Sequence, residues 1–215
     1  MEVIMPSKKR LFILGAGGFG RELESWLQLM PEAKRDWQIA GYLDKNKQAL
    51  DNFPSDYEII GDEDSYQFGS GDLVALSIIE PKIKEAIYSK LKNKVRFFTY
   101  IAPGVVWGKH NQIGEGTIIC PGCVISTNIN LGKLVTINTS SQIGHDTSIA
   151  DFCSIMANVD IGGGNKLGKR VFIGTNATII PQREVSDDAR IGSGSIVLRN
   201  IKEAKTVFGN PAKTI

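Results

Sequence analysis

The chain has 215 residues, a formal net charge of +2 at pH 7 and 22% charged residues. This length accommodates one or two domains, and the nearly balanced charge gives no basic surface that would point to a nucleic acid. No apolar run reaches the roughly 18 residues that a transmembrane helix needs, and no signal peptide is recognised ahead of Lys8. We therefore expect a cytoplasmic protein without membrane insertion.

The first hundred residues alternate apolar and amphipathic segments. The apolar runs predict strands at 10–14, 38–43, 58–60, 73–78 and 95–98. The amphipathic segments predict helices at 21–30, 62–67 and 81–93. Strands that alternate with helices are typical of a parallel sheet, so we expect an α/β, Rossmann-like domain over residues 1–100.

A glycine-rich turn, GAGGFG, follows the first predicted strand. Gly15, Gly17 and Gly20 match G-x-G-x-x-G between a strand and a helix, where glycines let the backbone approach an anion and the helix N–H groups bind it. Asp44 follows the second strand, as does the ribose-binding acid of NAD proteins. A redox Rossmann domain needs a second mononucleotide-binding half, for which this segment is too short. We therefore expect a phosphate-bearing substrate rather than NAD; a turn required only for packing is the alternative.

From residue 101 to residue 197, sixteen of the seventeen residues at every sixth position are Ile, Leu or Val, and the other is a Trp. The positions are Ile101, Trp107, Ile113, Ile119, Ile125, Leu131, Ile137, Ile143, Ile149, Ile155, Ile161, Leu167, Ile173, Ile179, Val185, Ile191 and Val197. Glycine often follows this residue, and a small or β-branched residue usually stands four positions after it. This is the hexapeptide repeat of a parallel β-helix.

The period excludes other regular structures, because an α-helix cannot hold residues six apart on one face and a flat strand alternates every second residue. Three hexapeptides would form one triangular coil, with the aliphatic and the small residue pointing inward. Gly and Asn would supply the positive φ that the corners need. The repeat predicts five to six coils without a loop insertion.

Cysteine usage does not predict a disulfide framework. The chain has three cysteines, an odd number without a secretory signal. Cys120 and Cys123 form a C-x-x-C pair, but Cys123 and Cys153 occupy the small inward position of the repeat, where a thiol fills space as an apolar group. We expect buried packing, with metal or redox chemistry as the alternative.

Four motifs together resemble the sugar acetyltransferases of the sialic acid O-acetyltransferase and bacillosamine-pathway N-acetyltransferase type. They are GAGGFG at 15–20, GYLDKN at 41–46, IGHD at 143–146 and GNPAK at 209–213. The resemblance covers nearly the whole chain. It implies an all-β left-handed β-helix over residues 101–215, an exception to the right-handed crossover rule, a homotrimer with active sites between subunits, acetyl-CoA as co-substrate and no metal.

The two histidines of the chain limit the choice of a general base. His145 stands two residues after the inward Ile143, which turns it outward at a corner, and an imidazole with a pKa of about 6.5 accepts a proton near neutral pH. The resemblance implies that His145 is the base, Asp146 its partner and Gly163, one coil further on, the backbone donor to the oxyanion. His110 has no such match and is expected to be solvated.

The resemblance also implies binding residues. For the sugar nucleotide they are Gly15, Gly17, Gly18, Phe19, Gly20, Asp44, Lys45 and Asn138. For acetyl-CoA they are Ser154, Gly174, Thr175, Ala177, Ser193, Pro211 and Lys213. Ser154 stands where the family often carries a second His, and Phe19 replaces a His common in the glycine turn.

The sequence thus favours transfer of an acetyl group from acetyl-CoA to the amino group of a UDP- or dTDP-linked amino-dideoxy sugar, directly, in a ternary complex. The alternative within the same class is O-acetylation of sialic acid or another glycan precursor. A different class is a hexapeptide prism that is non-catalytic or metal-dependent. A metal-dependent prism would need a trio of His ligands, which two histidines supply poorly.

Overall fold

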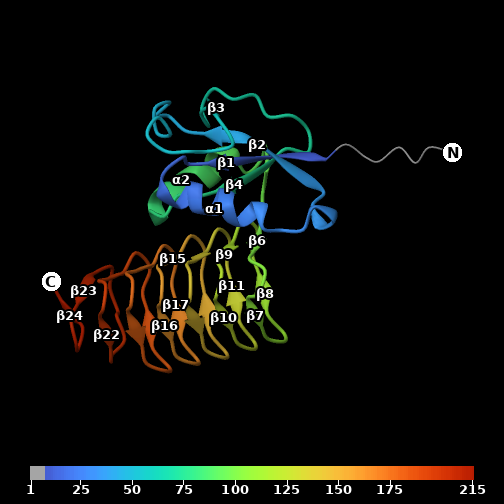
Figure 1. Cartoon of the computed structure of the whole chain (residues 1–215). Helices are drawn as coiled ribbons and strands as arrows, with labels where there is room; N and C mark the ends of the chain where they lie inside the picture. The colour runs from blue at the N-terminus through green and yellow to red at the C-terminus, as the bar shows by residue number, and fades with distance from the viewer. Residues whose placement is uncertain (1–7) are drawn as a thin grey trace. The chain divides into compact units, whose positions relative to one another are not determined.

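The computed structural model describes residues 8–215 (Figure 1). Their internal contacts define two compact units. The first comprises the residues up to Ile78 together with Lys90–Phe98, and the second comprises Ile79–Ser89 together with Thr99–Ile215. None of the helices in the described part of the chain has the length and apolar character needed to cross a membrane.

The first unit is a five-stranded parallel sheet in the order β3-β2-β1-β4-β5. Its strands are β1 (Lys9–Leu14), β2 (Trp37–Leu43), β3 (Ile59–Gly61), β4 (Leu73–Leu76) and β5 (Arg96–Phe97). Helix α1 (Gly18–Gln28) and the short 3₁₀ helix η1 (Glu32–Lys34) connect β1 to β2. The strand order reverses at β1, and the carboxyl ends of β1 and β4 lie side by side there, which is where α/β sheets bind ligands. The expected parallel α/β sheet is confirmed.

The helix predicted at 62–67 is wrong, because this segment forms turns. The carboxylate of Asp62 accepts hydrogen bonds from the backbone N–H groups of Asp64 and Ser65, at 2.8 and 3.0 Å. Such local side-chain bonds compete with helix formation.

The second unit is a parallel β-helix with three faces. Face I contains β7 (Val106–Trp107), β10 (Val124–Ile125), β13 (Gln142–Ile143), β16 (Asp160–Ile161), β19 (Thr178–Ile179) and β22 (Ile196–Val197). Face II contains β8 (Gln112–Ile113), β11 (Asn130–Leu131), β14 (Ser148–Ile149), β17 (Lys166–Leu167) and β20 (Glu184–Val185). Face III contains β6 (Tyr100–Ile101), β9 (Ile118–Ile119), β12 (Thr136–Ile137), β15 (Ser154–Ile155), β18 (Phe172–Ile173), β21 (Arg190–Ile191), β23 (Thr206–Phe208) and β24 (Lys213–Thr214).

Each recurring aliphatic is the second residue of its two-residue strand, as the period predicted. These side chains stack inside the β-helix, and from Ile119 to Val197 none is more than 3% exposed. Ile101 and Trp107 are 38% and 37% exposed, because the first coil has another coil on one side only. The last two strands, β23 and β24, form an antiparallel hairpin. The predicted left-handed β-helix of five to six coils is confirmed.

The corners differ from the expectation in how they use glycine. Positive φ occurs three residues after the aliphatic, and residues as different as Asp146 (φ 59°), Leu134 (φ 51°) and Phe152 (φ 65°) adopt it. The glycine directly after the aliphatic is needed for close approach of the next coil instead. A Cβ on Gly144, for example, would lie 2.5 Å from the backbone N of Gly163.

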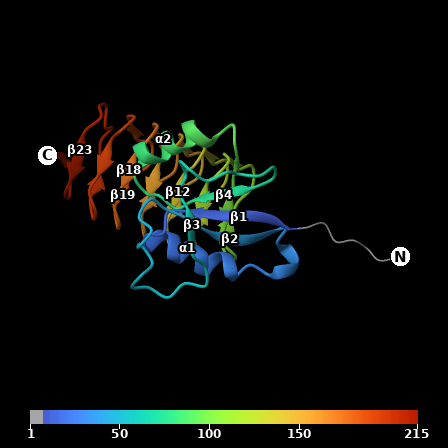
Figure 2. The same ribbon diagram turned by 90° about the horizontal axis from the view of Figure 1, so that it is seen from above.

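Helix α2 (Pro81–Leu91) lies along face III of the β-helix (Figure 2). Lys84 is 1% exposed and donates to the carbonyl oxygens of Leu134 and Cys153, both at 2.8 Å, and to Thr136 Oγ1 at 3.3 Å. Burial lowers the pKa of Lys84 to about 7, whereas three acceptors for three N–H bonds favour its ammonium form.

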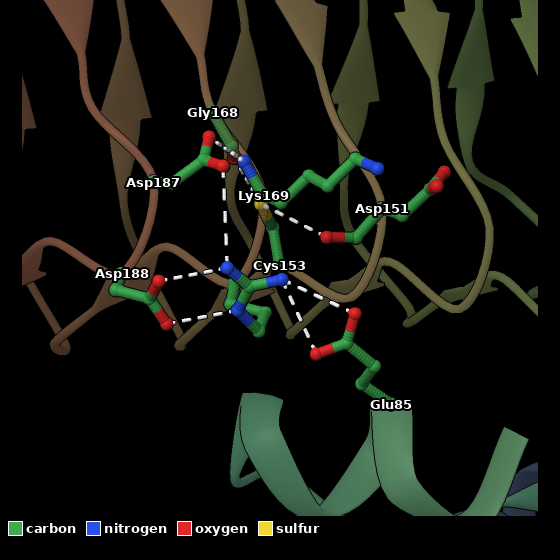
Figure 3. A network of polar contacts seen from close by, with 8 residues as sticks. Glu85, Asp151, Cys153, Gly168, Lys169, Asp187 and Asp188 are labelled. Atoms are coloured by element: carbon green, nitrogen blue, oxygen red, sulfur yellow. Dashed lines mark hydrogen bonds and ion pairs between the residues drawn. The ribbon is translucent and has the colours of Figure 1, made fainter. Parts of the chain in front are cut away.

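Ion pairs add to this attachment. The guanidinium of Arg170 binds Asp188 through Nε at 2.8 Å and Nη2 at 2.7 Å, and binds Glu85 of α2 through Nη1 at 3.2 Å (Figure 3). Arg190 similarly donates to Glu80 at 3.1 Å. The expected boundary at residue 100 assigns α2 to the first domain, whereas these bonds group most of it with the β-helix.

Candidate active site

His145 lies at the corner that joins β13 on face I to β14 on face II. Its Nδ1 is 2.7 Å from Oδ2 of Asp146, and Asn128 donates to the other oxygen of Asp146 at 2.9 Å. Because Nδ1 faces a carboxylate, it carries the ring proton and leaves Nε2 as a proton acceptor. The hydrogen bond from His145, with a second from Asn128, lowers the pKa of Asp146, so this carboxylate stays ionised beside the imidazole.

Gly163 occupies the same corner one coil further on, as the repeat predicted. The imidazole of His145 lies directly against it, since a Cβ on Gly163 would be 2.7 Å from Nε2 and 2.8 Å from Cε1. The next residue, Gly164, donates its N–H to the carbonyl oxygen of His145 at 2.7 Å. The structure therefore brings together His145, Asp146 and Gly163.

Three residues expected to contact acetyl-CoA lie at a different corner, between faces III and I. Gly174 and Thr175 precede β19 there, and Ser193 is one coil further on. A Cβ on Gly174 would be 2.6 Å from the backbone N of Ser193, so this glycine is required by the approach of two coils. The His145 corner lies at the opposite edge of face I. One chain alone therefore does not bring these residues next to His145.

Ser154 and Ala177 are fully buried. The Ser154 hydroxyl donates to the carbonyl oxygen of Ile79, and Ala177 belongs to the inward-facing core of the β-helix. The resemblance implies contact through the backbone of Ala177, on which the burial of its side chain does not bear, and the roles of Ser154 and Ala177 toward acetyl-CoA stay predictions.

The other predicted binding residues of the β-helix lie at its surface or just beneath it. Asn138 is 8% exposed, and its side-chain oxygen accepts the N–H of Thr139 at 2.6 Å. Pro211 and Lys213 are exposed in the segment that follows β23. These positions leave Pro211 and Lys213 accessible to a ligand.

The glycine turn lies at the carboxyl end of β1, and its glycines differ in why they are needed. Gly15 has a φ of +108°, and a Cβ on Gly20 would collide with the carbonyl oxygen of Gly15. A Cβ on Gly17 or Gly18 would meet no atom within 4 Å. Packing therefore explains Gly15 and Gly20 but not Gly17 and Gly18, whose open space suits a ligand at the N-terminus of α1.

The remaining predicted residues of the first unit are engaged within the chain. Asp44 accepts the N–H of Ala16 at 2.7 Å and that of Asn46 at 2.8 Å, so it supports the glycine turn. Lys45, whose side chain is exposed, forms ion pairs with Glu63 and Asp64, at 3.0 and 2.9 Å. The ring of Phe19 packs edge-on against Trp26, at 6.2 Å between centroids.

Arg21 was not singled out from the sequence, although it directly follows the glycine turn. Its guanidinium lies 3.6 Å from the ring centroid of Phe53, which is 48% exposed, and it donates to the carbonyl oxygen of Ala16 at 3.3 Å. A cation in the first turn of a helix that faces an open glycine turn is the signal that could have identified it.

Within residues 8–215, no three His, Cys, Asp or Glu side chains lie close enough together to hold a metal ion. Cys120, Cys123 and Cys153 are buried, and burial raises the pKa of Cys153 to about 12. A thiol in such surroundings packs as an apolar group, as the repeat position predicted.

Comparison with known proteins gives a family for the first part of the chain and a fold for nearly all of it. The family model of the PglD N-terminal domain matches residues 10–91. The acetyltransferase domain of PglB from Neisseria gonorrhoeae, in complex with acetyl coenzyme A, is 23% identical with a TM-score of 0.83, covering 97% of this chain and 100% of that one. PerB from Caulobacter crescentus, in complex with CoA and GDP-perosamine, is 22% identical with a TM-score of 0.82, covering 95% and 96%.

A curated relative is the bifunctional protein GlmU of Bdellovibrio bacteriovorus, 27% identical over 146 residues. The match covers 64% of this chain but 28% of the relative, so the chain spans less than a third of that protein's length. The motifs, the family match and the fold agree with one another. The family model of the PglD N-terminal domain thus covers the first part of the chain, and the fold of nearly the whole chain is that of the PglB acetyltransferase domain and of PerB.

Proposed function

We propose that the protein transfers the acetyl group of acetyl-CoA to the amino group of a nucleotide-linked amino-dideoxy sugar. The observation that carries this proposal is the arrangement at the His145 corner. Nδ1 of His145 is held by Asp146 at 2.7 Å, and its ring lies against Gly163. A positioned base beside a backbone donor is what attack of an amine on a thioester needs.

The reaction would proceed by direct transfer. The neutral amine attacks the thioester carbonyl carbon, a C–N bond forms, and the carbonyl oxygen becomes an oxyanion that the N–H of Gly163 stabilises. Nε2 of His145 takes the proton released by the nitrogen. The C–S bond then breaks, and the imidazolium returns this proton to the departing thiolate. The products are the acetamido sugar and CoA, and Asp146 stabilises the transient imidazolium.

The nucleotide would bind at the glycine turn of the first unit. Gly17 and Gly18 leave open space at the N-terminus of α1, where free N–H groups and the helix dipole favour a diphosphate. We propose a UDP or dTDP carrier. Because PerB binds GDP-perosamine, guanine nucleotides belong in the test.

The catalytic site would be shared between copies of the chain in a homotrimer. Two observations support this proposal. His145 and the candidate CoA residues Gly174 and Ser193 lie at opposite edges of face I, so a neighbouring copy would have to supply one of the two sets. Face I also exposes apolar side chains at Val106 and Val124, which are 60% and 37% exposed.

The test is a thiol-release assay with acetyl-CoA and a panel of UDP-, dTDP- and GDP-linked amino sugars, with free sialic acid in parallel. Turnover with a nucleotide-linked amino sugar, and an acetamide product by mass spectrometry, is the expected result. Turnover with sialic acid alone would replace the proposal with O-acetylation. The absence of thiol release with every acceptor would refute both.

A further inference from the structure

Two buried side chains converge on a single backbone carbonyl next to Gly163. Thr147 and Asn165 are 1% and 0% exposed. Thr147 Oγ1 donates to the carbonyl oxygen of Gly162 at 3.3 Å, and Asn165 Nδ2 donates to the same oxygen at 2.6 Å. Asparagine side chains at this corner of the β-helix also bond three other backbone carbonyls. Among the described residues, each of these carbonyls accepts one side-chain donor: they belong to Gly108, Ser126 and Ile180.

This carbonyl belongs to the same peptide unit as the N–H of Gly163. In a trans peptide the C=O and N–H bonds point in opposite directions, and the one cis peptide in residues 8–215 is Asn210–Pro211. Because the Gly162 carbonyl points inward to two buried donors, the Gly163 N–H points outward, away from the core. Gly163 is also the residue on which the His145 ring lies.

The Gly163 N–H donates no hydrogen bond within the described residues, whereas two N–H groups at the same repeat position bind a carboxylate. At the corner between faces II and III, the N–H groups of Lys133 and Lys169 each donate to a carboxylate of the next coil at 2.8 Å, from Asp151 and Asp187 respectively. Figure 3 shows Asp187 beside Lys169. The geometry of this repeat position therefore allows its N–H to bind an anionic oxygen.

At the corner of Gly163, Pro181 stands in the place that Asp187 takes relative to Lys169. Proline has no side-chain acceptor, so this N–H remains open to an oxygen from outside the chain. Two hydrogen bonds accepted by the carbonyl of a peptide also polarise its N–H, which strengthens the hydrogen bond that this N–H donates by about 10–30% per bond.

We propose that Thr147 and Asn165 are positioning residues: from inside the β-helix they orient and polarise the Gly162–Gly163 peptide so that its outward N–H binds the oxyanion of the transition state. This inference rests on the proposed acetyl transfer. It adds to the proposed catalytic machinery two buried side chains that contact neither acetyl-CoA nor the sugar.

The repeat supplies matched controls. Asn111 is the equivalent of Asn165 three coils earlier and makes the same three kinds of bond, to the carbonyls of Gly108 and Ser126 and from the N–H of Ile129. Thr117 donates to the Gly132 carbonyl at 2.9 Å and accepts the N–H of Val135 at 3.1 Å. Replacing Asn111 or Thr117 therefore removes at least as many hydrogen bonds as replacing Asn165 or Thr147. These bonds lie in other coils or at other corners than His145.

The experiment compares Thr147→Val with Thr117→Val, and Asn165→Ala with Asn111→Ala. Loss of one whole oxyanion donor costs about 10² to 10³ in kcat, so loss of orientation and polarisation should lower kcat by roughly ten-fold in Thr147→Val and Asn165→Ala, with KM for acetyl-CoA unchanged. The controls should lower Tm to a similar degree and keep kcat within about two-fold. Thr147→Ser, which keeps the hydroxyl, should restore kcat. An equal fall of kcat in test and control variants would overturn the inference.

A second measurement is independent of turnover. With ¹⁵N-glycine labelling, the amide proton of Gly163 should shift upfield in Thr147→Val and Asn165→Ala and stay unchanged in Asn111→Ala. If the wild-type protein acetylates no acceptor, the proposed function fails while this shift still decides whether the two side chains act on the peptide. An unchanged Gly163 resonance in both test variants refutes the inference by itself.

Discussion

Replacing Gly163 with Ala tests the geometry of the His145 corner directly. The added Cβ would lie 2.7 Å from Nε2, 2.8 Å from Cε1 and 3.0 Å from Cδ2 of His145. Since non-bonded atoms need about 3.5 Å, the imidazole would have to move by roughly 0.8 Å. The φ of Gly163 is not among the positive values, so Ala is compatible with this backbone. The displaced side chain is 65% exposed, so it can move without disturbing the core.

We therefore expect Gly163→Ala to fold normally and to lose catalysis. A misplacement of about 1 Å can cost 10²-fold in rate, which corresponds to about 2.7 kcal/mol of activation free energy. The assay is thiol release at saturating acetyl-CoA, with Tm measured by circular dichroism. If the loss acts through His145, the double variant Gly163→Ala/His145→Ala should be no slower than His145→Ala. A near-wild-type kcat in Gly163→Ala, or additive losses in the double variant, would refute this reasoning.

Three further predictions concern the base, the glycine turn and a half-buried ion pair. His145→Ala should lower kcat by about 10² to 10⁴ without lowering Tm, because the side chain is 65% exposed; a folded variant with wild-type turnover would exclude His145 as the base. Gly17→Val should raise KM for the nucleotide sugar and leave KM for acetyl-CoA unchanged, since a Cβ there meets no atom of the chain within 4 Å; an equal rise in both KM values would contradict a nucleotide site. Asp188→Asn should lower Tm at neutral pH. Its hydrogen bond to Arg170 lowers the pKa of Asp188 from an ordinary value of 3.8, so the unfolded state binds more protons between the two values and stability falls as the pH drops through them. The Tm difference between wild type and Asp188→Asn should accordingly shrink below a pH of about 4, and a constant difference down to pH 2 would show that the ion pair does not cause it.

The sequence predicted the β-helix well, because its period is a direct consequence of which side chains point inward. The same period placed Gly163 one coil after His145, which the structure bears out in their contact. The role of the repeat glycines was misjudged, since a glycine needed for close approach and one needed for positive φ look alike in a sequence. Gly144 is of the first kind and Gly164, with a φ of +71°, of the second.

Other features depend on partners distant in the chain. Ser154 precedes the inward Ile155, so the alternation of a strand turns its side chain outward, yet it is buried because its hydroxyl donates to the carbonyl of Ile79. Asn165 went unnoticed because it replaces a small residue at an inward position, and nothing in the local sequence indicates that it bonds the Gly162 carbonyl. The helix expected at 62–67 failed for a local reason, since the Asp62 side chain takes the N–H groups that would begin it.

The attachment of α2 has a consequence for the order in which the chain can fold during synthesis. Helix α2 lies in the sequence between β4 and β5 of the N-terminal sheet. The carbonyl acceptors of its Lys84 are 50 and 69 residues further along the chain, and the partner of Glu80, Arg190, is 110 residues further along. The helix therefore leaves the ribosome long before its binding surface exists. A fragment that ends at residue 100 would expose the ammonium of Lys84 to water instead of to the carbonyls of Leu134 and Cys153. Dividing the chain at residue 100, the boundary expected from the sequence, would therefore separate α2 from the β-helix that it binds.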